Sequence, residues 1–160
     1  ILSEPNCIIL VAGETSAEKS SFLNLLMERD VLSTSHLAAT STIYLIHPIE
    51  PESTRYFKVH LNGKKPKKYI VSKQNENEML TKLKKMLVCR EERYRNARVD
   101  IYRQVPLLDY NYHATLVDTP GIGESKEMSE SVYEYLTNAS AFIFIINSAY
   151  AGGVQKDNVI

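Results

Sequence analysis

The sequence is poor in several features that would identify a protein class at once. It has only two cysteines, Cys7 and Cys89, and both lie in apolar patterns, so we expect buried thiols rather than a disulfide framework or a metal site. The four histidines share no spacing and predict no metal site either. The longest apolar runs, Cys7–Ala12 and Ala141–Ile146, hold six residues each, whereas a membrane-spanning helix needs roughly 20. The sequence therefore predicts no transmembrane segment.

An excess of charge of one sign is also missing. Lysine and arginine number 19 and aspartate and glutamate number 19, which gives a formal net charge of zero over 160 residues. A dedicated nucleic-acid-binding protein usually carries a strong basic excess, so we expect no nucleic-acid partner. The chain begins at Ile1 without a methionine or a charged-then-apolar leader. We expect an excerpt of a cytoplasmic protein, with no signal peptide.

What the sequence does contain is the opening of an α/β unit. Asn6–Ala12 is a continuous apolar run rich in branched residues, which predicts a strand buried on both faces. Gly13 follows it, and Ser20–Met27 then has helical spacing with one broad apolar face. Strand, glycine-led loop and helix in this order are typical of a nucleotide-binding fold.

The patterns further along predict short strands around an inserted hairpin and helix. Arg55–Val71 predicts a hairpin because Asn62–Gly63 stands between two strand-like runs. Glu76–Arg98 has the clearest helical periodicity. The other predicted elements are a loop at Asp30–Ser41, strands at Thr42–Ile46, Val99–Leu108 and Ala114–Val117, a turn at Asp109–His113, a loop at Asp118–Gly123, a helix at Glu127–Asn138 and a fully buried strand at Ala141–Ile146.

The most informative stretch joins the first strand to the first helix. It reads Gly13-Glu14-Thr15-Ser16-Ala17-Glu18-Lys19-Ser20-Ser21. A phosphate-binding loop has glycine, four residues and Gly-Lys-Ser/Thr in this context, and its backbone N–H groups surround the phosphates at the positive end of a helix. We expect Lys19 to reach the β- and γ-phosphates and Ser20 to ligate Mg²⁺.

One position departs from this pattern, because Glu18 stands where the second glycine belongs. If the loop forces it into a left-handed conformation, the strain costs on the order of 1 kcal/mol or more, and its negative charge repels the phosphates. We therefore expect nucleotide binding to be weakened or lost. An alternative stays open, in which Glu18 points outward and the loop still works.

A second motif supports a nucleotide site. Asp118-Thr119-Pro120-Gly121 follows an apolar run, so Asp118 is expected at the carboxyl end of a strand, the edge at which ligands bind in open α/β sheets. There Asp118 would hold the water shell of Mg²⁺, and the Gly121 N–H would contact the γ-phosphate. A hydroxyl from the threonine-rich segment Thr34–Thr42 would complete the metal site.

Together these stretches resemble a known family. Gly13–Leu26, Arg29–Thr42 and Leu116–Ser125 look like the first three GTPase motifs of the dynamin superfamily. The resemblance implies an α/β, three-layer P-loop GTPase fold with a mainly parallel central sheet and a hairpin and helix insertion. Residues 1–160 would be the N-terminal portion of the GTPase domain, truncated before the base-specificity motif.

The resemblance also implies a role for each matching residue. Ser16 would stabilise charge between the β- and γ-phosphates, with a bound monovalent cation nearby, and Thr40 would position the attacking water. Lys19 and Gly121 would join them in catalysis. The implied metal ligands are Ser20, Thr40 and Asp118. The implied nucleotide-binding residues are Gly13, Glu14, Thr15, Ser16, Ala17, Glu18, Lys19, Ser20, Ser21, Asp118 and Gly121.

The function implied is GTP hydrolysis to GDP and phosphate in membrane remodelling, by fission, fusion or tethering. The partners would be guanine nucleotide, a second GTPase domain met through Tyr150–Asp157, and membrane lipid bound by regions absent from this chain. Because the guanine-reading fourth motif is also absent, an ATP-binding P-loop protein stays an alternative. A pseudo-GTPase scaffold, suggested by Glu18, and an excerpt that does not fold alone are the others.

A lysine-rich turn carries a separate question. Lys64-Lys65-Pro66-Lys67-Lys68 places four cations on the predicted hairpin. Contact with anionic lipid, worth about 1 kcal/mol per basic residue, is one interpretation. A solvated hairpin tip is favoured over it, because the chain as a whole is neutral.

Overall fold

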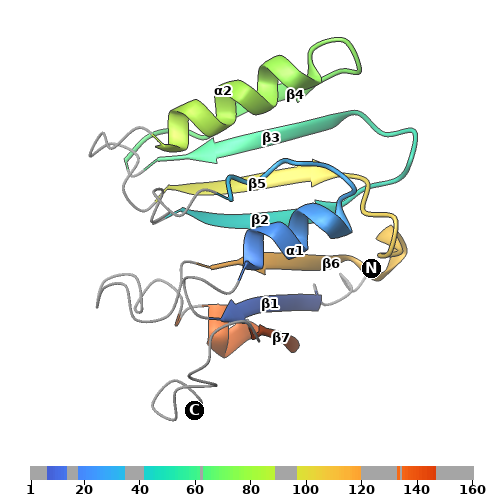
Figure 1. The fold of residues 1–160 in the computed structure, drawn as a ribbon, viewed down its shortest axis with the longest axis vertical. Coiled ribbons are helices and arrows are strands. Elements are labelled where there is room, and N and C mark those ends of the chain that lie inside the picture. Colours follow the sequence, from blue (N-terminus) through green and yellow to red (C-terminus); the bar gives the residue numbers. More distant parts are fainter. Residues whose placement is uncertain are drawn as a thin grey trace.

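The fold is known from a computed structural model that describes residues 7–13, 18–34, 42–61, 63–88, 97–119, 133 and 135–146. Within them one seven-stranded sheet has the order β4-β3-β5-β2-β6-β1-β7 (Figure 1). The elements are β1 (Cys7–Gly13), α1 (Lys19–Leu26), β2 (Ile43–Pro48), β3 (Arg55–His60), β4 (Lys67–Val71), α2 (Glu76–Val88), β5 (Arg98–Arg103), the 3-10 turn η2 (Tyr110–Tyr112), β6 (Ala114–Asp118) and β7 (Ala141–Ile145).

The predicted α/β fold is confirmed, and its sheet is mixed. β1 is parallel to both β6 and β7, and β2 is parallel to β5. β2 is antiparallel to β6, and β3 is antiparallel to β4 and β5. Two of the three antiparallel pairings arise because the inserted hairpin β3–β4 joins the sheet beside β5, and the third joins β2 to β6.

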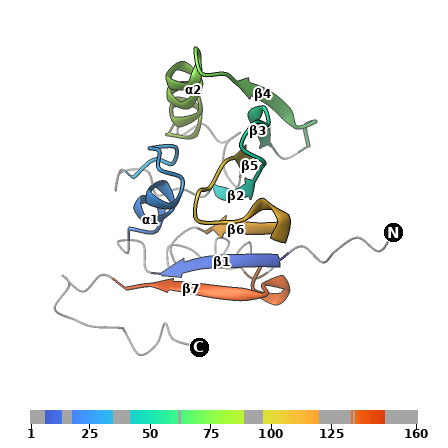
Figure 2. The same cartoon turned by 90° about the vertical axis from the view of Figure 1, so that its right-hand side faces the viewer.

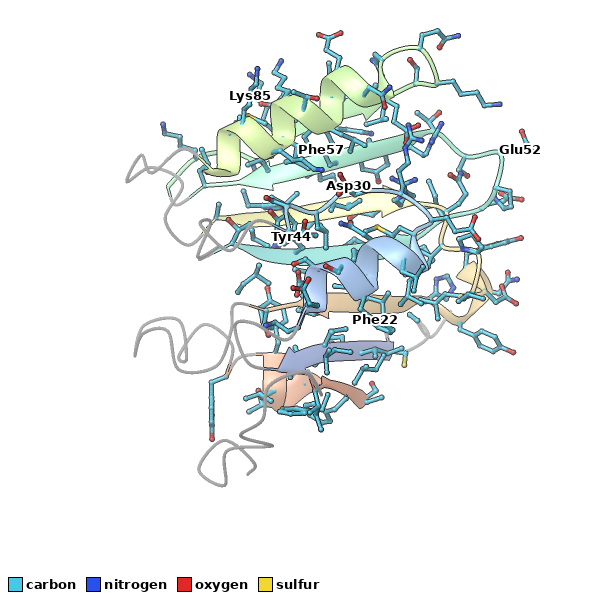
Figure 3. The ribbon with its side chains drawn as sticks, viewed as in Figure 1. Phe22, Asp30, Tyr44, Glu52, Phe57 and Lys85 are labelled. Carbon is cyan, nitrogen blue, oxygen red and sulfur yellow. The ribbon has the colours of Figure 1, made fainter. Side chains whose placement is uncertain are left out.

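Helices cover both faces of the sheet. Successive side chains of a strand point to opposite faces, and the apolar strands therefore bury side chains on each face. α1 and α2 lie on the same face (Figure 2), where Val11 and Leu116 pack with Leu23 of α1 and Leu83 of α2. Phe57 lies in this core between α2 and the sheet (Figure 3). On the other face, Leu10, Ile43 and Val117 pack against residues of the helical segment 135–138 and its end, Tyr135, Leu136 and Ala139. These are the three layers expected.

Several predicted boundaries were wrong. Arg98 opens β5 instead of ending the helix, since it pairs with Ile43 in the parallel ladder; residues 89–96 lie outside the described part. β5 stops at Arg103, short of the predicted Leu108, and Pro106 in the following turn has no N–H to extend a ladder. Asp118 is the last residue of β6, not the first of a loop.

Two predictions of burial were also wrong. β7 is an edge strand whose only described neighbour is β1, and it leaves Phe142 56% and Phe144 41% exposed. A continuous apolar run does not reveal whether its strand is central or at an edge. Cys7 is half-buried at the start of β1, and Cys89 lies outside the described residues. No helix in the described part is long and apolar enough to cross a membrane.

Candidate nucleotide-binding site

The predicted phosphate-loop lysine begins a helix directly beside the end of the first strand. Lys19 is the first residue of α1 and is buried. Its ammonium Nζ donates a hydrogen bond to the carbonyl oxygen of Gly13, the last residue of β1, at 3.1 Å. The side chain therefore points back to the end of β1. It lies at the N-terminus of the helix, where the dipole favours anions.

The second motif meets the first at this edge of the sheet. β1 and β6 pair in parallel with Val11 opposite Asp118, so Asp118 stands at the carboxyl end of the strand beside the phosphate loop. The Ser20 hydroxyl donates a hydrogen bond to Asp118 Oδ2 at 2.9 Å. Thr119 ties the segment after β6 to β1, because its hydroxyl donates to the Val11 carbonyl oxygen at 3.3 Å. Two of the expected metal ligands are thus in direct contact.

The surroundings of Asp118 suit a divalent cation. Its side chain is buried, and Oδ1 has no hydrogen-bond partner among the described residues. Burial raises the pKa of Asp118 to about 6, although the Ser20 hydrogen bond and the Lys19 charge both lower it. A buried carboxylate oxygen without a partner, next to a serine hydroxyl, is a set of oxygen donors that Mg²⁺ takes up readily. The residues present therefore fit the ion that the second motif predicts.

Glu18 adopts the strained backbone that its position demands. Its φ is 57° and its ψ is 31°, in the left-handed region, where an L-residue pays roughly 1–2 kcal/mol. The side chain is exposed, and its Oε2 accepts a hydrogen bond from the Ser21 hydroxyl at 2.5 Å. The carboxylate thus lies along the first turn of α1, where the helix dipole favours negative charge. Glu18 therefore has the backbone conformation that glycine adopts most easily.

Several predicted site residues lie outside the described part of the chain. These are Glu14, Thr15, Ser16 and Ala17 of the loop, Thr40, Gly121 and the segment Tyr150–Asp157. Their roles stay predictions. The residues that the structure brings together at the edge formed by β1, α1 and β6 are Gly13, Glu18, Lys19, Ser20, Ser21 and Asp118.

The sequence patterns did not predict the role of one residue of α1. Asn24 is buried in α1, and its Oδ1 accepts hydrogen bonds from the backbone N–H of Val31 at 3.0 Å and of Leu32 at 2.8 Å. Its Nδ2 donates to the Leu32 carbonyl oxygen at 2.9 Å. Asn24 therefore fixes the segment that leads into the threonine-rich stretch. The sequence feature that could have indicated this role is an asparagine among the apolar residues of an amphipathic helix.

Comparison with known proteins agrees with this geometry. A family profile described as the dynamin family matches residues 9–157. The curated protein named dynamin-like protein 2, from Campylobacter jejuni subsp. jejuni serotype O:23/36 (strain 81-176), is 26% identical over 160 residues. That match covers 98% of this chain and 23% of the relative, so the chain spans about a quarter of its length.

Two solved structures are similar as well. Both belong to work on an oligomerised bacterial dynamin pair that provides a mechanism for long-range sensing and tethering of membranes. One is 25% identical with a TM-score of 0.58, and the other is 22% identical with a TM-score of 0.56. Each match covers 88% of this chain and 20% of the solved chain. With the family profile matching almost its whole length, the chain belongs to the dynamin family.

Proposed function

We propose that residues 1–160 form the N-terminal portion of a dynamin-type GTPase domain that binds and hydrolyses GTP. The observation that carries the proposal is the contact between Ser20 and Asp118 beside Lys19, at the carboxyl ends of β1 and β6. A phosphate loop and an acidic motif that meet in this way form a site for a nucleotide triphosphate and Mg²⁺.

Each described residue has a task in this scheme. Lys19 exchanges its bond to the Gly13 carbonyl for the β- and γ-phosphates. Ser20 and ionised Asp118 hold Mg²⁺, which neutralises phosphate charge when bound. Because the protein does little covalent chemistry in phosphoryl transfer, these residues act by positioning and charge stabilisation. Ser16, Thr40 and Gly121 would complete the catalytic set, with a monovalent cation near Ser16.

A pseudo-GTPase scaffold is the second candidate, and Glu18 is the observation that favours it. Its carboxylate brings negative charge to the N-terminus of α1, the place that the phosphates would occupy. Two features support a loop that still works: the backbone already has the left-handed conformation, and the carboxylate is exposed and bonded to Ser21. We therefore expect binding that is weakened by Glu18 but not abolished.

The wider role that we propose is membrane remodelling, by fission, fusion or tethering. The similar solved structures come from an oligomerised dynamin pair that senses and tethers membranes. We propose that the protein containing this chain likewise self-associates through its GTPase domain and acts at a membrane. The chain spans only 20–23% of these relatives, so this role would need the rest of the protein.

Titration with a fluorescent GTP analogue, with and without Mg²⁺, tests the site. We expect the chain to bind more tightly with Mg²⁺. Asp118→Asn and Ser20→Ala should each lose about 10- to 100-fold of that affinity, as is common when a metal site is altered. Ser53→Ala, a serine in an exposed turn, is the matched control and should bind like the parent.

Competition with unlabelled ATP and GTP, carried out on the full-length protein because residues 1–160 lack the guanine-reading motif, then establishes which base the site accepts. Displacement by GTP alone supports the GTPase assignment, whereas equal displacement by ATP contradicts it. If a folded chain, checked by circular dichroism, binds no nucleotide, or if Asp118→Asn binds as well as the parent, the proposed site is wrong.

A further inference from the structure

The positive charge of this neutral chain is concentrated in one hairpin. Residues 55–71, here called the basic hairpin, comprise β3, β4 and the turn between them. They contain six lysine and arginine residues and no aspartate or glutamate. Because the whole chain has a net charge of zero, the remainder carries a net charge of minus six. Overall neutrality therefore hides a strongly cationic surface.

The lysines of the basic hairpin are accessible and unneutralised. The side chains of Lys64, Lys65, Lys67 and Lys68 are exposed. In the described part of the chain no carboxylate forms an ion pair with any of them, whereas Arg55 is bonded to Glu76 at 3.0 Å. Unpaired charges of one sign on a small surface produce a field that attracts a polyanion.

The arrangement of these charges costs the fold stability. Lys58 and Lys68 stand directly opposite each other in the β3–β4 register, and like charges in such a pair are destabilising. The cost is partly offset by aromatic rings, since Lys68 Nζ lies 3.9 Å from the Tyr56 ring centroid. Asp100 faces Lys58 from β5, but it is buried and already contacts His60 at 2.7 Å and Arg98. Because the Lys58–Lys68 pair destabilises the fold, we infer that these lysines serve to bind another molecule.

The shape and the aromatic groups of this region favour a flat anionic surface over nucleic acid. β4 is the outer strand of the sheet, and Ile70, 58% exposed, shares a face with Lys68. The rings nearby stack on each other, with Tyr102 lying 4.3 Å from Tyr56 and 4.4 Å from His47. Rings stacked in this way leave fewer free faces on which bases could stack. Lysines around an exposed isoleucine match the interface of an anionic membrane.

We propose that the basic hairpin docks the domain onto membranes that carry anionic lipid. The electrostatic attraction of each basic residue to such a surface increases partition of the protein onto the membrane roughly fivefold. β3 and β1 run in the same direction, so both strands end on the same side of the sheet (Figure 1). The turn that follows β3 therefore lies on the side where β1 ends and α1 begins. β3 and β1 are separated by the width of the intervening strands β5, β2 and β6, so docking does not require nucleotide.

Vesicle co-sedimentation of the 160-residue chain tests the proposal. We expect binding to vesicles of phosphatidylcholine with phosphatidylserine, no binding to phosphatidylcholine alone, and a decline as salt rises. Lys64→Glu combined with Lys65→Glu should weaken binding about 25-fold or more. Lys64→Arg with Lys65→Arg should bind like the parent, because only charge matters. As a matched pair, Lys65→Glu should weaken binding more than Lys73→Glu, an exposed lysine beyond the other end of β4.

The proposal is wrong if the chain binds neither vesicle, if it binds both equally, or if the Lys64→Glu and Lys65→Glu variant binds as well as the parent. Binding of a single-stranded DNA probe in place of the vesicles would also overturn it. Salt-sensitive self-association that the variant loses would identify a second copy as the partner and would also contradict the proposal. GTP titration of the same variant separates this inference from the proposed function, since we expect its nucleotide affinity to be unchanged.

Discussion

At the residue scale, two glutamates hold a backbone conformation that glycine adopts most easily. Glu18 has φ 57° and precedes α1, and Glu28 has φ 50° and follows it. Each pays roughly 1–2 kcal/mol of strain. Only Glu18 belongs to the phosphate loop, so the pair separates the effect of strain from the effect of a charge near the phosphates.

We expect Glu18→Gly to raise the free energy of unfolding by about 1 kcal/mol, because relief of strain exceeds the entropy that glycine adds to the unfolded chain. It should also tighten GTP binding, because a negative charge is removed. Glu28→Gly should give a similar gain in stability and no change in GTP affinity. Urea unfolding and nucleotide titration measure the two effects. Equal affinities for Glu18→Gly and the parent would show that the carboxylate does not hinder binding.

A half-buried histidine makes stability depend on pH. Burial lowers the pKa of His47, aided by the charges of Arg98 and Lys58 and opposed by Asp100. His47 Nδ1 lies 3.2 Å from the Thr115 hydroxyl, and no described residue bonds to Nε2. The folded state therefore disfavours the protonated ring.

Above the ordinary histidine pKa both states hold a neutral ring, and His47 adds no pH dependence. As the pH falls below about 6.5, the unfolded state takes up the proton first, so the free energy of unfolding decreases. We expect His47→Gln to lose less stability than the parent between about pH 7.5 and about pH 5.5 in urea titrations. Asp118 contributes equally to both proteins, so the difference isolates His47. Parallel pH profiles would contradict the assignment.

At the element scale, α1 does more than carry the phosphate-binding residues. Through Asn24 it holds the backbone of Val31 and Leu32 after the helix has ended. Leu32 is fully buried there and Val31 nearly so. A single amide side chain thus joins the helix of the phosphate loop to the start of the threonine-rich segment, which is the segment expected to carry the first switch.

Replacing this amide should be costly. We expect Asn24→Leu to lower the free energy of unfolding by about 2–5 kcal/mol, because it removes the Asn24 bonds to the buried N–H and carbonyl oxygen of Leu32. Leu25→Ala is the control, since Leu25 is 74% exposed and its loss should cost within about 0.5 kcal/mol. Urea unfolding of both variants measures the difference. Similar stabilities would mean that the Asn24 bonds do not hold the segment.

At the scale of the whole molecule, the sequence predicted what depends on local pattern. The apolar runs before Gly13 and Asp118 predicted β1 and β6, and parallel pairing brought Ser20 to Asp118. Local pattern did not reveal that β7 has a single strand beside it in the described part of the chain, because exposure depends on which elements lie beside a strand. Nor did it reveal the bonds of Asn24, which join residues across a turn. Composition averaged over the chain hid the charge of the basic hairpin.

The strand order also sets when the phosphate loop is complete. Of three neighbouring strands β1 is made first, yet it lies between β6, which begins at Ala114, and β7, which ends at Ile145. At a synthesis rate of about 5–20 residues per second, β1 waits roughly 7–26 s for both neighbours. Contacts this distant in the chain also close slowly. The phosphate loop therefore gains both flanking strands, and nucleotide can assist folding, only after Ile145 has been synthesised.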